Sequence, residues 1–288
     1  MTTILRPFRV YFEITRSYSP LLMCAGAFLG MIISRGVGLD FWESLIPLAS
    51  LYFLTSASFV FNDIFDLETD KVNGINRPLS AGELSFKSAW VLWALLEISG
   101  LGLLTYINHR GAALLLIFSY GLSLLYTLKI KEYGLLGNVL VSLFVSLSII
   151  YGALSIDGKF PLPLLSLVYL AFLLNLAREV IQGIADAPGD AVKNVRSFSM
   201  IYGAKRAKIF GITLFSLMLI SAPLVINASG SNLFRNHALI YGYIFNVAGF
   251  SYALYKLYLS SEKDVRRVLK IINLLTASLI ALLLISLI

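Results

Sequence analysis

The sequence of 288 residues contains one cysteine, Cys24, and few charged residues. A single cysteine excludes an intramolecular disulfide and any metal site built from several thiolates. Charged residues account for 14% of the chain, whereas a soluble globular domain has about a quarter. Hydrophobic residues account for 58%. The composition therefore predicts a protein that lies in lipid and whose fold depends on helix packing alone.

Apolar stretches of about 18–25 residues recur along the whole chain, and each is long enough to cross a hydrocarbon core of about 30 Å. Glycine and proline separate these stretches where hairpin turns are expected. The first 18 residues carry three arginines and lack a small-residue cleavage site, which favours the flank of a retained first helix over a signal peptide. The pattern predicts an all-α integral membrane protein, a single domain over residues 1–288, with nine transmembrane helices at 18–34, 41–65, 86–107, 111–128, 134–156, 161–187, 204–226, 236–259 and 266–287.

The basic residues are distributed unevenly between the two sides of these spans. The side that holds the N-terminus collects 18 of the 23 lysines and arginines, the opposite side has four, and Arg178 lies inside the sixth span. Cytoplasmic loops of membrane proteins carry an excess of Lys and Arg. We therefore expect a multi-pass protein of the cell membrane whose N-terminus lies in the cytoplasm.

Acidic residues gather at the cytoplasmic end of the second span. Asn62, Asp66 and Asp70 follow one another at i, i+4 and i+8, with Asp63 beside them. Residues four apart lie on one face of a helix, about 5–6 Å from each other, so a carbonyl oxygen and two carboxylates can reach one point. Carboxylates at the edge of a membrane helix are costly unless they are paired or bind a cation, which makes this cluster a candidate functional site on the cytoplasmic face.

The same order of amide, carboxylate and carboxylate recurs 120 residues later as Gln182, Asp186 and Asp190. Pro188 and Gly189 predict that the helix ends before Asp190, so that this last aspartate lies in a loop. The recurrence indicates an internal repeat of spans one to four and five to eight. We therefore expect two four-helix halves plus a ninth helix around a central cavity.

The two clusters together suit magnesium. Mg²⁺ prefers oxygen ligands and is often shared between one or two protein carboxylates and the phosphates of a substrate. Two clusters that face each other would hold Mg²⁺ on either side of a diphosphate. The alternative is that both are solvated helix ends that happen to be acidic, but this alternative does not explain why the same three-residue pattern occurs twice. The candidate metal ligands are Asn62, Asp63, Asp66, Asp70, Asp186 and Asp190.

A diphosphate also requires cationic partners on the same membrane face. Tyr126 precedes Lys129 by one helical turn, so that a hydroxyl and an ammonium can share one phosphate. Lys131, two residues further on, is explained at least as well by a solvated surface position as by a phosphate contact. Arg178 lies inside a span, and it either pairs with a carboxylate or reaches a substrate phosphate, because an intramembrane arginine needs a partner. The candidate catalytic residues are Asp66, Asp70, Asp186, Asp190 and Lys129, and the candidate substrate-binding residues are Asn62, Arg77, Tyr126, Arg178, Gln182, Lys193 and Arg196.

These motifs resemble those of the UbiA superfamily of intramembrane prenyltransferases over nearly the whole chain. The resemblance implies an enzyme that uses Mg²⁺ to transfer an isoprenyl chain from its diphosphate to a lipid-like acceptor. It rests on two aspartate motifs, an Arg-Pro pair with a following glycine, a Tyr/Lys motif and a Gly-Asn pair, which correspond to Asn62, Asp63, Asp66, Asp70, Arg77, Pro78, Gly82, Tyr126, Lys129, Gly137, Asn138, Asp186 and Asp190.

Within the superfamily, the run from Arg178 to Asp186 is most similar to archaeal ether-lipid enzymes that join a geranylgeranyl chain to geranylgeranylglyceryl phosphate. This resemblance implies geranylgeranyl diphosphate as donor and that glyceryl phosphate as acceptor. The sequence departs from that branch at Gln182, where lysine is usual, and at Ala185, where glutamate is usual. An aromatic acceptor, as in quinone biosynthesis, is the alternative.

A membrane transporter is a more remote alternative. Transporter sites tend to lie near the middle of the bilayer on interrupted helices. Here both acidic clusters fall at the ends of their spans and beside basic loops. This placement favours phosphate chemistry at the membrane surface over transport.

Overall fold

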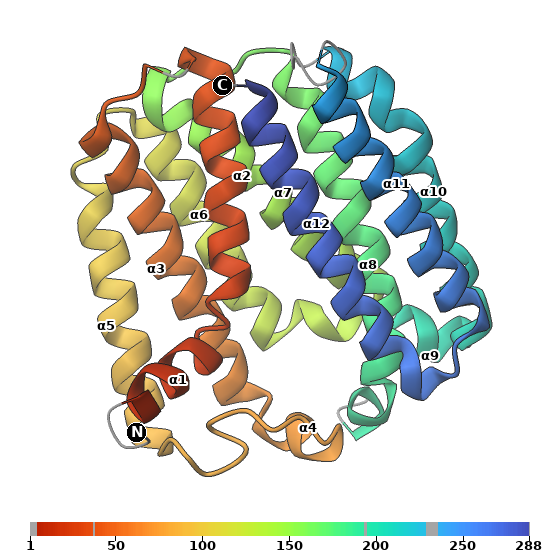
Figure 1. Cartoon of the computed structure of the whole chain (residues 1–288). Coiled ribbons are helices and arrows are strands. Elements are labelled where there is room, and N and C mark those ends of the chain that lie inside the picture. Colours follow the sequence, from red (N-terminus) through yellow and green to blue (C-terminus); the bar gives the residue numbers. More distant parts are fainter. Residues whose placement is uncertain (1–4, 37, 193–194, 229–235, 288) are drawn as a thin grey trace.

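The structure is a computed structural model that describes residues 5–36, 38–192, 195–228 and 236–287. These residues form helices and connecting turns, without a β-strand. The long helices stand side by side around a central space (Figure 1). Nine helices of the described residues have 18 residues or more, namely α2 (Tyr18–Arg35), α3 (Phe41–Phe65), α5 (Phe86–Leu104), α6 (Arg110–Leu128), α7 (Leu135–Asp157), α8 (Leu164–Val192), α10 (Ala204–Ala228), α11 (His237–Leu259) and α12 (Val265–Leu287).

Short elements join the long helices at the foot of the bundle, where the chain also begins, while α12 ends at the opposite side (Figure 1). These elements are the helices α1 (Leu5–Ile14), α4 (Leu67–Val72) and α9 (Phe198–Tyr202) and the 3₁₀ helices η1 (Ile130–Tyr133) and η3 (Glu262–Asp264).

The predicted all-helical membrane architecture is confirmed. Within the described residues, eight of the long helices have the length and apolar composition needed to cross a membrane, and they coincide with eight predicted spans. α11 is long enough but falls outside this group, because its five tyrosines and Asn246 lower its mean hydropathy.

The end of the sixth span differs from its prediction. The sequence predicts a helix end at Pro188 and Gly189, whereas α8 continues through both residues to its last turn. A proline inside a helix removes one backbone hydrogen bond, and polar groups from neighbouring helices satisfy the disturbed turn. The carbonyl of Ala185 accepts a hydrogen bond from Arg266 (3.0 Å), and the N–H of Gly189 donates to the side chain of Asn73 (2.8 Å). The second cluster is therefore wholly helical.

The hydrophobic core is divided into two clusters that follow the two halves of the chain. One is formed mainly by α3, α5 and α6, and the other by α7, α8, α10, α11 and α12. α2 and α7 pack against each other where the halves meet, and α12 packs against α2, α8 and α11. The two cores thus separate the first half of the chain from the second, and α12 packs as part of the second core.

Glycines allow α2 and α7 to approach closely. A Cβ atom at Gly30 would overlap the backbone carbonyl of Ile149, and one at Gly152 would overlap the carbonyl of Ala27. Small residues at such contacts let the backbones of membrane helices pack directly against each other. The contact fixes the two halves, and with them the two acidic clusters, relative to each other.

Candidate functional site

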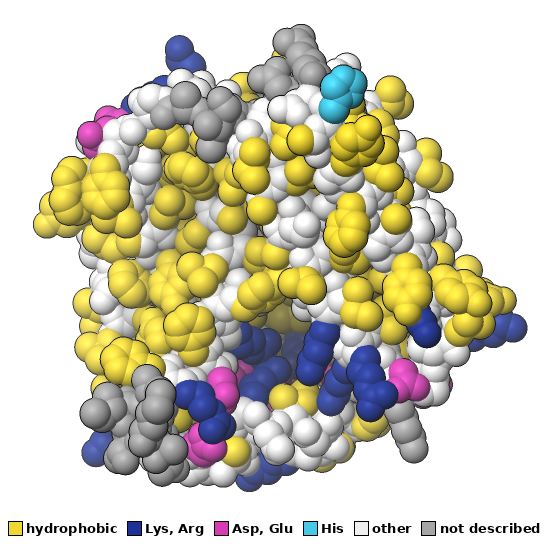
Figure 2. Space-filling view, viewed as in Figure 1, with side chains coloured by type: hydrophobic (Ala, Val, Ile, Leu, Met, Phe, Trp, Pro, Cys, Tyr) yellow, Lys and Arg dark blue, Asp and Glu magenta, His cyan; other side chains and the backbone are white. Residues whose placement is uncertain are grey.

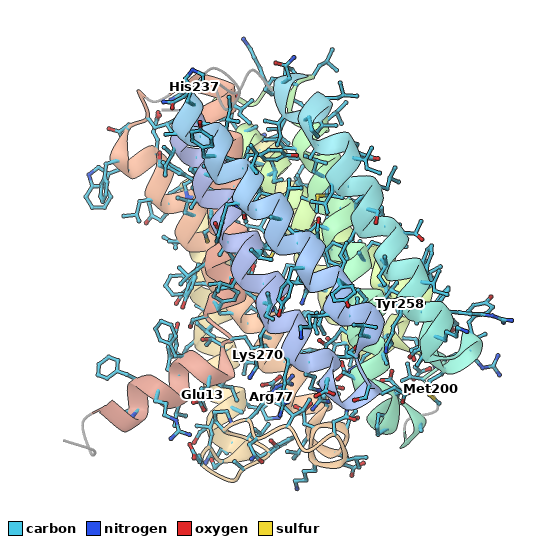
Figure 3. The ribbon with its side chains drawn as sticks, turned by 45° about the vertical axis from the view of Figure 1, so that its right-hand side comes forward. Glu13, Arg77, Met200, His237, Tyr258 and Lys270 are labelled. Carbon is cyan, nitrogen blue, oxygen red and sulfur yellow. The ribbon has the colours of Figure 1, made fainter. Side chains whose placement is uncertain are left out.

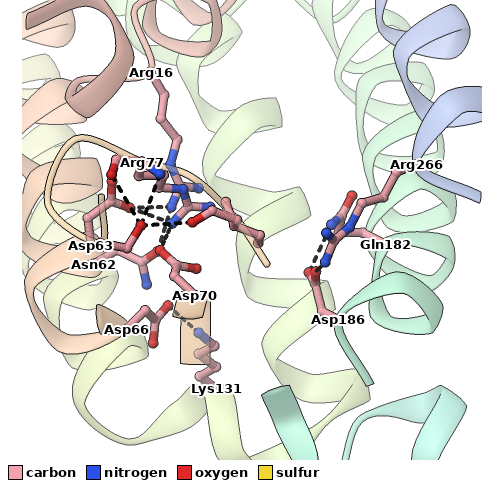
Figure 4. Close-up of polar contacts among 12 residues, drawn as sticks. Arg16, Asn62, Asp63, Asp66, Asp70, Arg77, Lys131, Gln182, Asp186 and Arg266 are labelled. Carbon is pink, nitrogen blue, oxygen red and sulfur yellow. Dashed lines mark hydrogen bonds and ion pairs between the residues drawn. The ribbon is translucent and has the colours of Figure 1, made fainter. Parts of the chain in front are cut away.

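The first acidic cluster lies at the junction of α3 and α4 (Figure 4). Asp66 separates the two helices with φ −96° and ψ 7°. Its N–H donates to the carbonyl of Asn62, and the N–H of Asp70 donates to the carbonyl of Asp66, each at 2.8 Å. The junction therefore keeps the three predicted residues in consecutive turns, and all three line the central cavity.

Asp63 orders two arginines instead of facing the cavity. Its side chain is 1% exposed, and its Oδ1 atom accepts hydrogen bonds from Arg16 Nη2 (2.5 Å) and Arg77 Nη1 (2.7 Å). Arg77 Nη1 also donates to Asp70 Oδ2 (2.6 Å). Asp63 does not belong to the cavity lining within the described residues. The structure thus places this predicted metal ligand behind the site, as the counter-ion of both arginines.

The lysine that reaches the first cluster is Lys131, not the predicted Lys129. Lys131 Nζ forms an ion pair with Asp66 and lines the cavity. The Lys129 side chain is 61% exposed and pairs with Glu132 at 3.1 Å. The prediction counts one helical turn from Tyr126, but α6 ends at Leu128 and the chain turns into η1. The 3₁₀ turn directs the second lysine inward.

The second acidic cluster lies on α8, across the cavity from the first (Figure 4). Gln182 Nε2 donates to Asp186 Oδ2 (2.8 Å), and Arg266 Nη2 of α12 donates to Asp186 Oδ1 (3.3 Å). Asp190 is buried, with 7% of its surface exposed. Gln182, Asp186 and Asp190 all line the cavity, so their predicted common face is confirmed.

Asn73 connects the two clusters. Its side-chain oxygen accepts the hydrogen bond from Gly189, and its backbone carbonyl accepts one from Arg266 Nη1 (3.0 Å). A Cβ atom at Gly189 would overlap the side chains of Asn73 and Thr69. Glycine at this position lets α4 and α8 approach closely enough for the two clusters to face one cavity.

The cavity has a volume of about 560 Å³. Lys and Arg side chains surround its opening near the foot of the molecule, and hydrophobic side chains cover the surface above it (Figure 2). The cavity extends from the acidic clusters along apolar walls provided by helices of both halves, with Leu54, Phe144, Leu167, Met218 and Leu283 among the lining residues. It can therefore hold a ligand with a charged end and a long apolar chain.

The remaining predicted residues divide between the cavity and the surface. Tyr126 and Arg178 line the cavity, and Arg178 forms an ion pair with Glu179. Arg196 is exposed, and only its backbone approaches the site loop, where its N–H donates to the carbonyl of Glu132 (3.2 Å). Lys193 lies outside the described residues.

Sequence reasoning missed three residues of the site, Arg16, Asn73 and Arg266, and it weighed Lys131 equally as a phosphate partner and as a solvated surface residue. Arg16 lies in the turn before α2 and Arg266 at the start of α12, both far from either cluster in the sequence, so neither spacing nor hydropathy links them to the site. Lys131 carried a signal, since it follows Tyr126 on the same membrane face.

Burial controls the electrostatics of the first cluster. Desolvation raises the pKa of Asp70 to about 6, against an opposing effect of Arg77 and with a further increase caused by Asp63. Burial also lowers the pKa of Arg77, and the neighbouring Arg16 lowers it further. The cluster therefore holds several carboxylates and two arginines in a small volume, an arrangement typical of sites that bind an ion or a charged ligand.

The donor set fits a hard cation that is shared with a ligand. Within the described residues, no group of three or more His, Cys, Asp or Glu side chains converges closely enough to hold a metal ion by itself. The cavity wall instead offers carboxylates in pairs, Asp66 with Asp70 and Asp186 with Asp190. Mg²⁺ is commonly bound by one or two carboxylates, with water and substrate phosphates completing its shell.

The comparisons with known sequences agree with this site. The sequence profile of the UbiA prenyltransferase family matches residues 23–280. A digeranylgeranylglyceryl phosphate synthase from Thermococcus kodakarensis is 35% identical over 222 residues, which cover 77% of this chain and 79% of the relative. The synthase of the same name from Saccharolobus solfataricus is 30% identical over 215 residues, which cover 74% and 76%.

Solved structures share the fold. A UbiA homologue from Aeropyrum pernix superimposes with a TM-score of 0.74 at 18% identity, over 93% of this chain and 98% of the other. A digeranylgeranylglyceryl phosphate synthase structure gives 0.70 at 24% identity, over 97% and 98%. A UbiA homologue from Archaeoglobus fulgidus bound to DMAPP and Mg²⁺ gives 0.65 at 18% identity, over 96% and 99%.

Proposed function

Because this chain belongs to the UbiA prenyltransferase family, we propose that it transfers the geranylgeranyl group of geranylgeranyl diphosphate to geranylgeranylglyceryl phosphate, with Mg²⁺ as cofactor. The observation that carries this proposal is one cavity with two facing aspartate clusters at its charged end and apolar walls beyond them. The choice of acceptor is supported by the relatives at 30–35% identity, which are named digeranylgeranylglyceryl phosphate synthase.

Asn62, Asp66 and Asp70 on one side, and Asp186 and Asp190 on the other, would hold Mg²⁺ together with the diphosphate. The homologue that is bound to DMAPP and Mg²⁺ supports this cofactor. When bound, Mg²⁺ neutralises the charge that develops on the departing diphosphate. Gln182 and Arg266 orient Asp186 for this role through their hydrogen bonds to its two oxygens.

The cationic side chains of the first cluster bind the diphosphate. Arg16, Arg77 and Lys131 line the cavity beside Asp66 and Asp70, and arginine in particular suits bidentate contacts with phosphate oxygens. Tyr126 also lines the cavity. These groups hold the diphosphate while the bond between its bridging oxygen and C1 of the isoprenyl chain breaks.

The apolar walls bind the isoprenyl chain and keep water from C1. As the leaving oxygen departs, C1 gains cationic character, and a hydroxyl oxygen of the acceptor forms the new C–O bond. The hydroxyl proton leaves to solvent, and diphosphate is the second product. Exclusion of water prevents hydrolysis of the donor, and the lining by Leu54, Phe144 and Leu167 supports this exclusion.

The placement in the membrane is part of the same proposal. We infer that all nine long helices cross the bilayer, with α11 as the span beyond the eight apolar ones, and that the chain is a single domain. The excess of Lys and Arg on the side of the acidic clusters supports a cytoplasmic site. Anionic substrates would then reach it from the cytoplasm.

The test is a transfer assay on purified protein in lipid vesicles, with labelled geranylgeranyl diphosphate and Mg²⁺. Geranylgeranylglyceryl phosphate and a hydroxybenzoate-type acid are offered in parallel. Product from the glyceryl phosphate alone supports the proposal. Product from the aromatic acid alone overturns the acceptor but keeps prenyl transfer, and product from neither, with donor intact, overturns the proposal for these substrates.

The two-cluster arrangement is tested in the same assay with Asp66→Asn and Asp190→Asn. Each variant should lose transfer while keeping the melting temperature of the parent, because the carboxylates bind the metal and diphosphate and not the helix core. Glu262→Gln, an exposed carboxylate in η3 before α12, is the matched control. Normal turnover by either aspartate variant at limiting Mg²⁺ would show that one cluster is dispensable.

A further inference from the structure

The first helix, α1, has one charged face and one aromatic face. Arg9 and Glu13 form an i, i+4 ion pair at 2.9 Å, and both side chains are largely exposed. Phe8 and Phe12 are also four residues apart and are 67% and 58% exposed. A short helix with these two faces is typical of one that lies in the interface of a bilayer, with its aromatic face among the lipid chains.

The position of α1 supports the same orientation. It projects sideways from the foot of the bundle, away from the long helices (Figure 3). Other exposed aromatic side chains occur at the same end of the bundle, at the end of α3, the start of α5 and the end of α11: Phe65, Phe86 and Tyr258. Aromatic residues concentrate where membrane helices leave the hydrocarbon, so the aromatic face of α1 continues the lipid-facing surface of the spans.

A buried elbow joins α1 to α2. Ile14, Thr15 and Ser17 are fully buried. The Thr15 and Ser17 hydroxyls share a hydrogen bond of 2.7 Å, and Ser17 shares another of 3.0 Å with the Tyr52 hydroxyl. Between them, Arg16 has φ 48°, the one positive φ of a non-glycine residue in the described chain. A residue other than glycine holds this conformation only where its surroundings impose it.

The conformation of the elbow places the Arg16 side chain in the first acidic cluster. Besides its ion pair with Asp63, Arg16 Nη2 donates to Asn62 Oδ1 (3.1 Å), and its guanidinium lies over the Phe59 ring at 4.9 Å from the centroid. Arg16 thus connects the elbow to Asn62 of the site and to Asp63, the counter-ion behind it.

We propose that α1 docks in the lipid interface on the face of the membrane that bears the aspartate clusters, with Phe8 and Phe12 immersed, and that this docking holds Arg16 in the first cluster. The partner of this surface is the bilayer itself. Arg9 also pairs with Glu83 of the loop after α4 (3.3 Å), which keeps the charged face toward water. Membrane contact of α1 therefore acts on the site without contacting the substrate.

The immersion is tested by depth measurements that require no turnover. Cys24 is the only cysteine, so Cys24→Ala gives a background for single spin labels at Phe8→Cys, Phe12→Cys, Arg9→Cys and Glu13→Cys in vesicles. Labels at 8 and 12 should be accessible to oxygen and shielded from a water-soluble nickel chelate, and labels at 9 and 13 should show the reverse. Equal exposure of both faces to the chelate would overturn the docking.

The coupling to the site is tested with the double variant Phe8→Ser/Phe12→Ser. Loss of the docked position should raise the Mg²⁺ concentration for half-maximal transfer by about fivefold or more, the scale of a typical coupling between sites. The matched control is Phe41→Ser/Trp42→Ser, a pair of equally exposed aromatics at the start of α3, on the opposite membrane face. An equal Mg²⁺ requirement in both variants would overturn the coupling.

A third variant separates this result from failure of the fold or of the proposed function. Arg16→Lys keeps the charge but not the fork that contacts Asn62 and Asp63, and it should raise the Mg²⁺ requirement while labels at positions 8 and 12 stay immersed. If Arg16→Lys leaves the requirement unchanged, Arg16 does not transmit the docking. The label depths stand whichever acceptor the enzyme uses.

Discussion

At the scale of single residues, the two lysines after α6 offer a matched pair. Lys131→Ala removes the cation that contacts Asp66 in the cavity, whereas Lys129→Ala removes an exposed side chain. Lys131→Ala should lower kcat/KM by about a hundredfold, as expected for loss of one preorganised charge contact, and Lys129→Ala should change it by less than about twofold, because surface ion pairs contribute little. Steady-state transfer kinetics with both variants would measure this, and equal losses would contradict the assignment.

The Asp70 carboxyl predicts a pH dependence of metal binding. Its pKa is raised to about 6, mainly by burial, and Mg²⁺ requires the ionised form. Protons should therefore compete with Mg²⁺ as the pH falls through about 6, with the required Mg²⁺ concentration rising about tenfold for each unit below that value. Above it, the requirement should level off.

The measurement is the Mg²⁺ concentration for half-maximal transfer between about pH 5 and about pH 8. Asp70→Asn is the control, because it binds Mg²⁺ more weakly at every pH but has no carboxyl at position 70 to titrate. A curve of the same shape in the parent and in Asp70→Asn would assign the pH dependence to another group.

These residues show what sequence spacing can and cannot predict. Asn62, Asp66 and Asp70 follow helical periodicity, so their common direction could be predicted. Lys131 could not be chosen over its neighbour, because its direction depends on the 3₁₀ turn after α6. Arg16 reaches the site through a backbone conformation that no propensity predicts.

At the scale of helices, the contact between α2 and α7 predicts where a methyl group is not tolerated. Gly152→Ala would overlap the carbonyl of Ala27, so the helices must separate, which should cost about 1–3 kcal/mol. Gly102→Ala in α5 meets nothing within 4 Å and should leave stability unchanged or slightly higher. Thermal unfolding in detergent measures the melting temperature of both variants. A similar melting temperature for the two would show that the close contact between α2 and α7 does not determine the stability of the fold.

Helix positions could be predicted almost entirely, since long apolar stretches are forced into helices by the lack of water for their backbone groups. The helix end predicted at Pro188 was wrong because backbone groups at this position also find hydrogen-bond partners inside the protein. The sequence signal for a helix end is local, whereas the hydrogen bonds from Asn73 and Arg266 that maintain α8 come from distant segments. Tertiary contacts of this kind have no local signature.

At the scale of the whole molecule, the depth of the cavity predicts which donor fits. Ala171 and Asp186 both line the cavity on α8, and their separation of 15 positions in the sequence corresponds to about 22 Å along the helix. Ala171→Phe fills the cavity far from the diphosphate, so it should lower kcat/KM for geranylgeranyl diphosphate by about tenfold and leave geranyl diphosphate unaffected. Leu224→Phe, on the lipid-facing side of α10 with 78% exposure, should change neither. Equal losses for both donors with Ala171→Phe would mean that the isoprenyl chain does not extend along α8, and the N-terminal half of the cavity, between α3, α6 and α7, would then have to hold it.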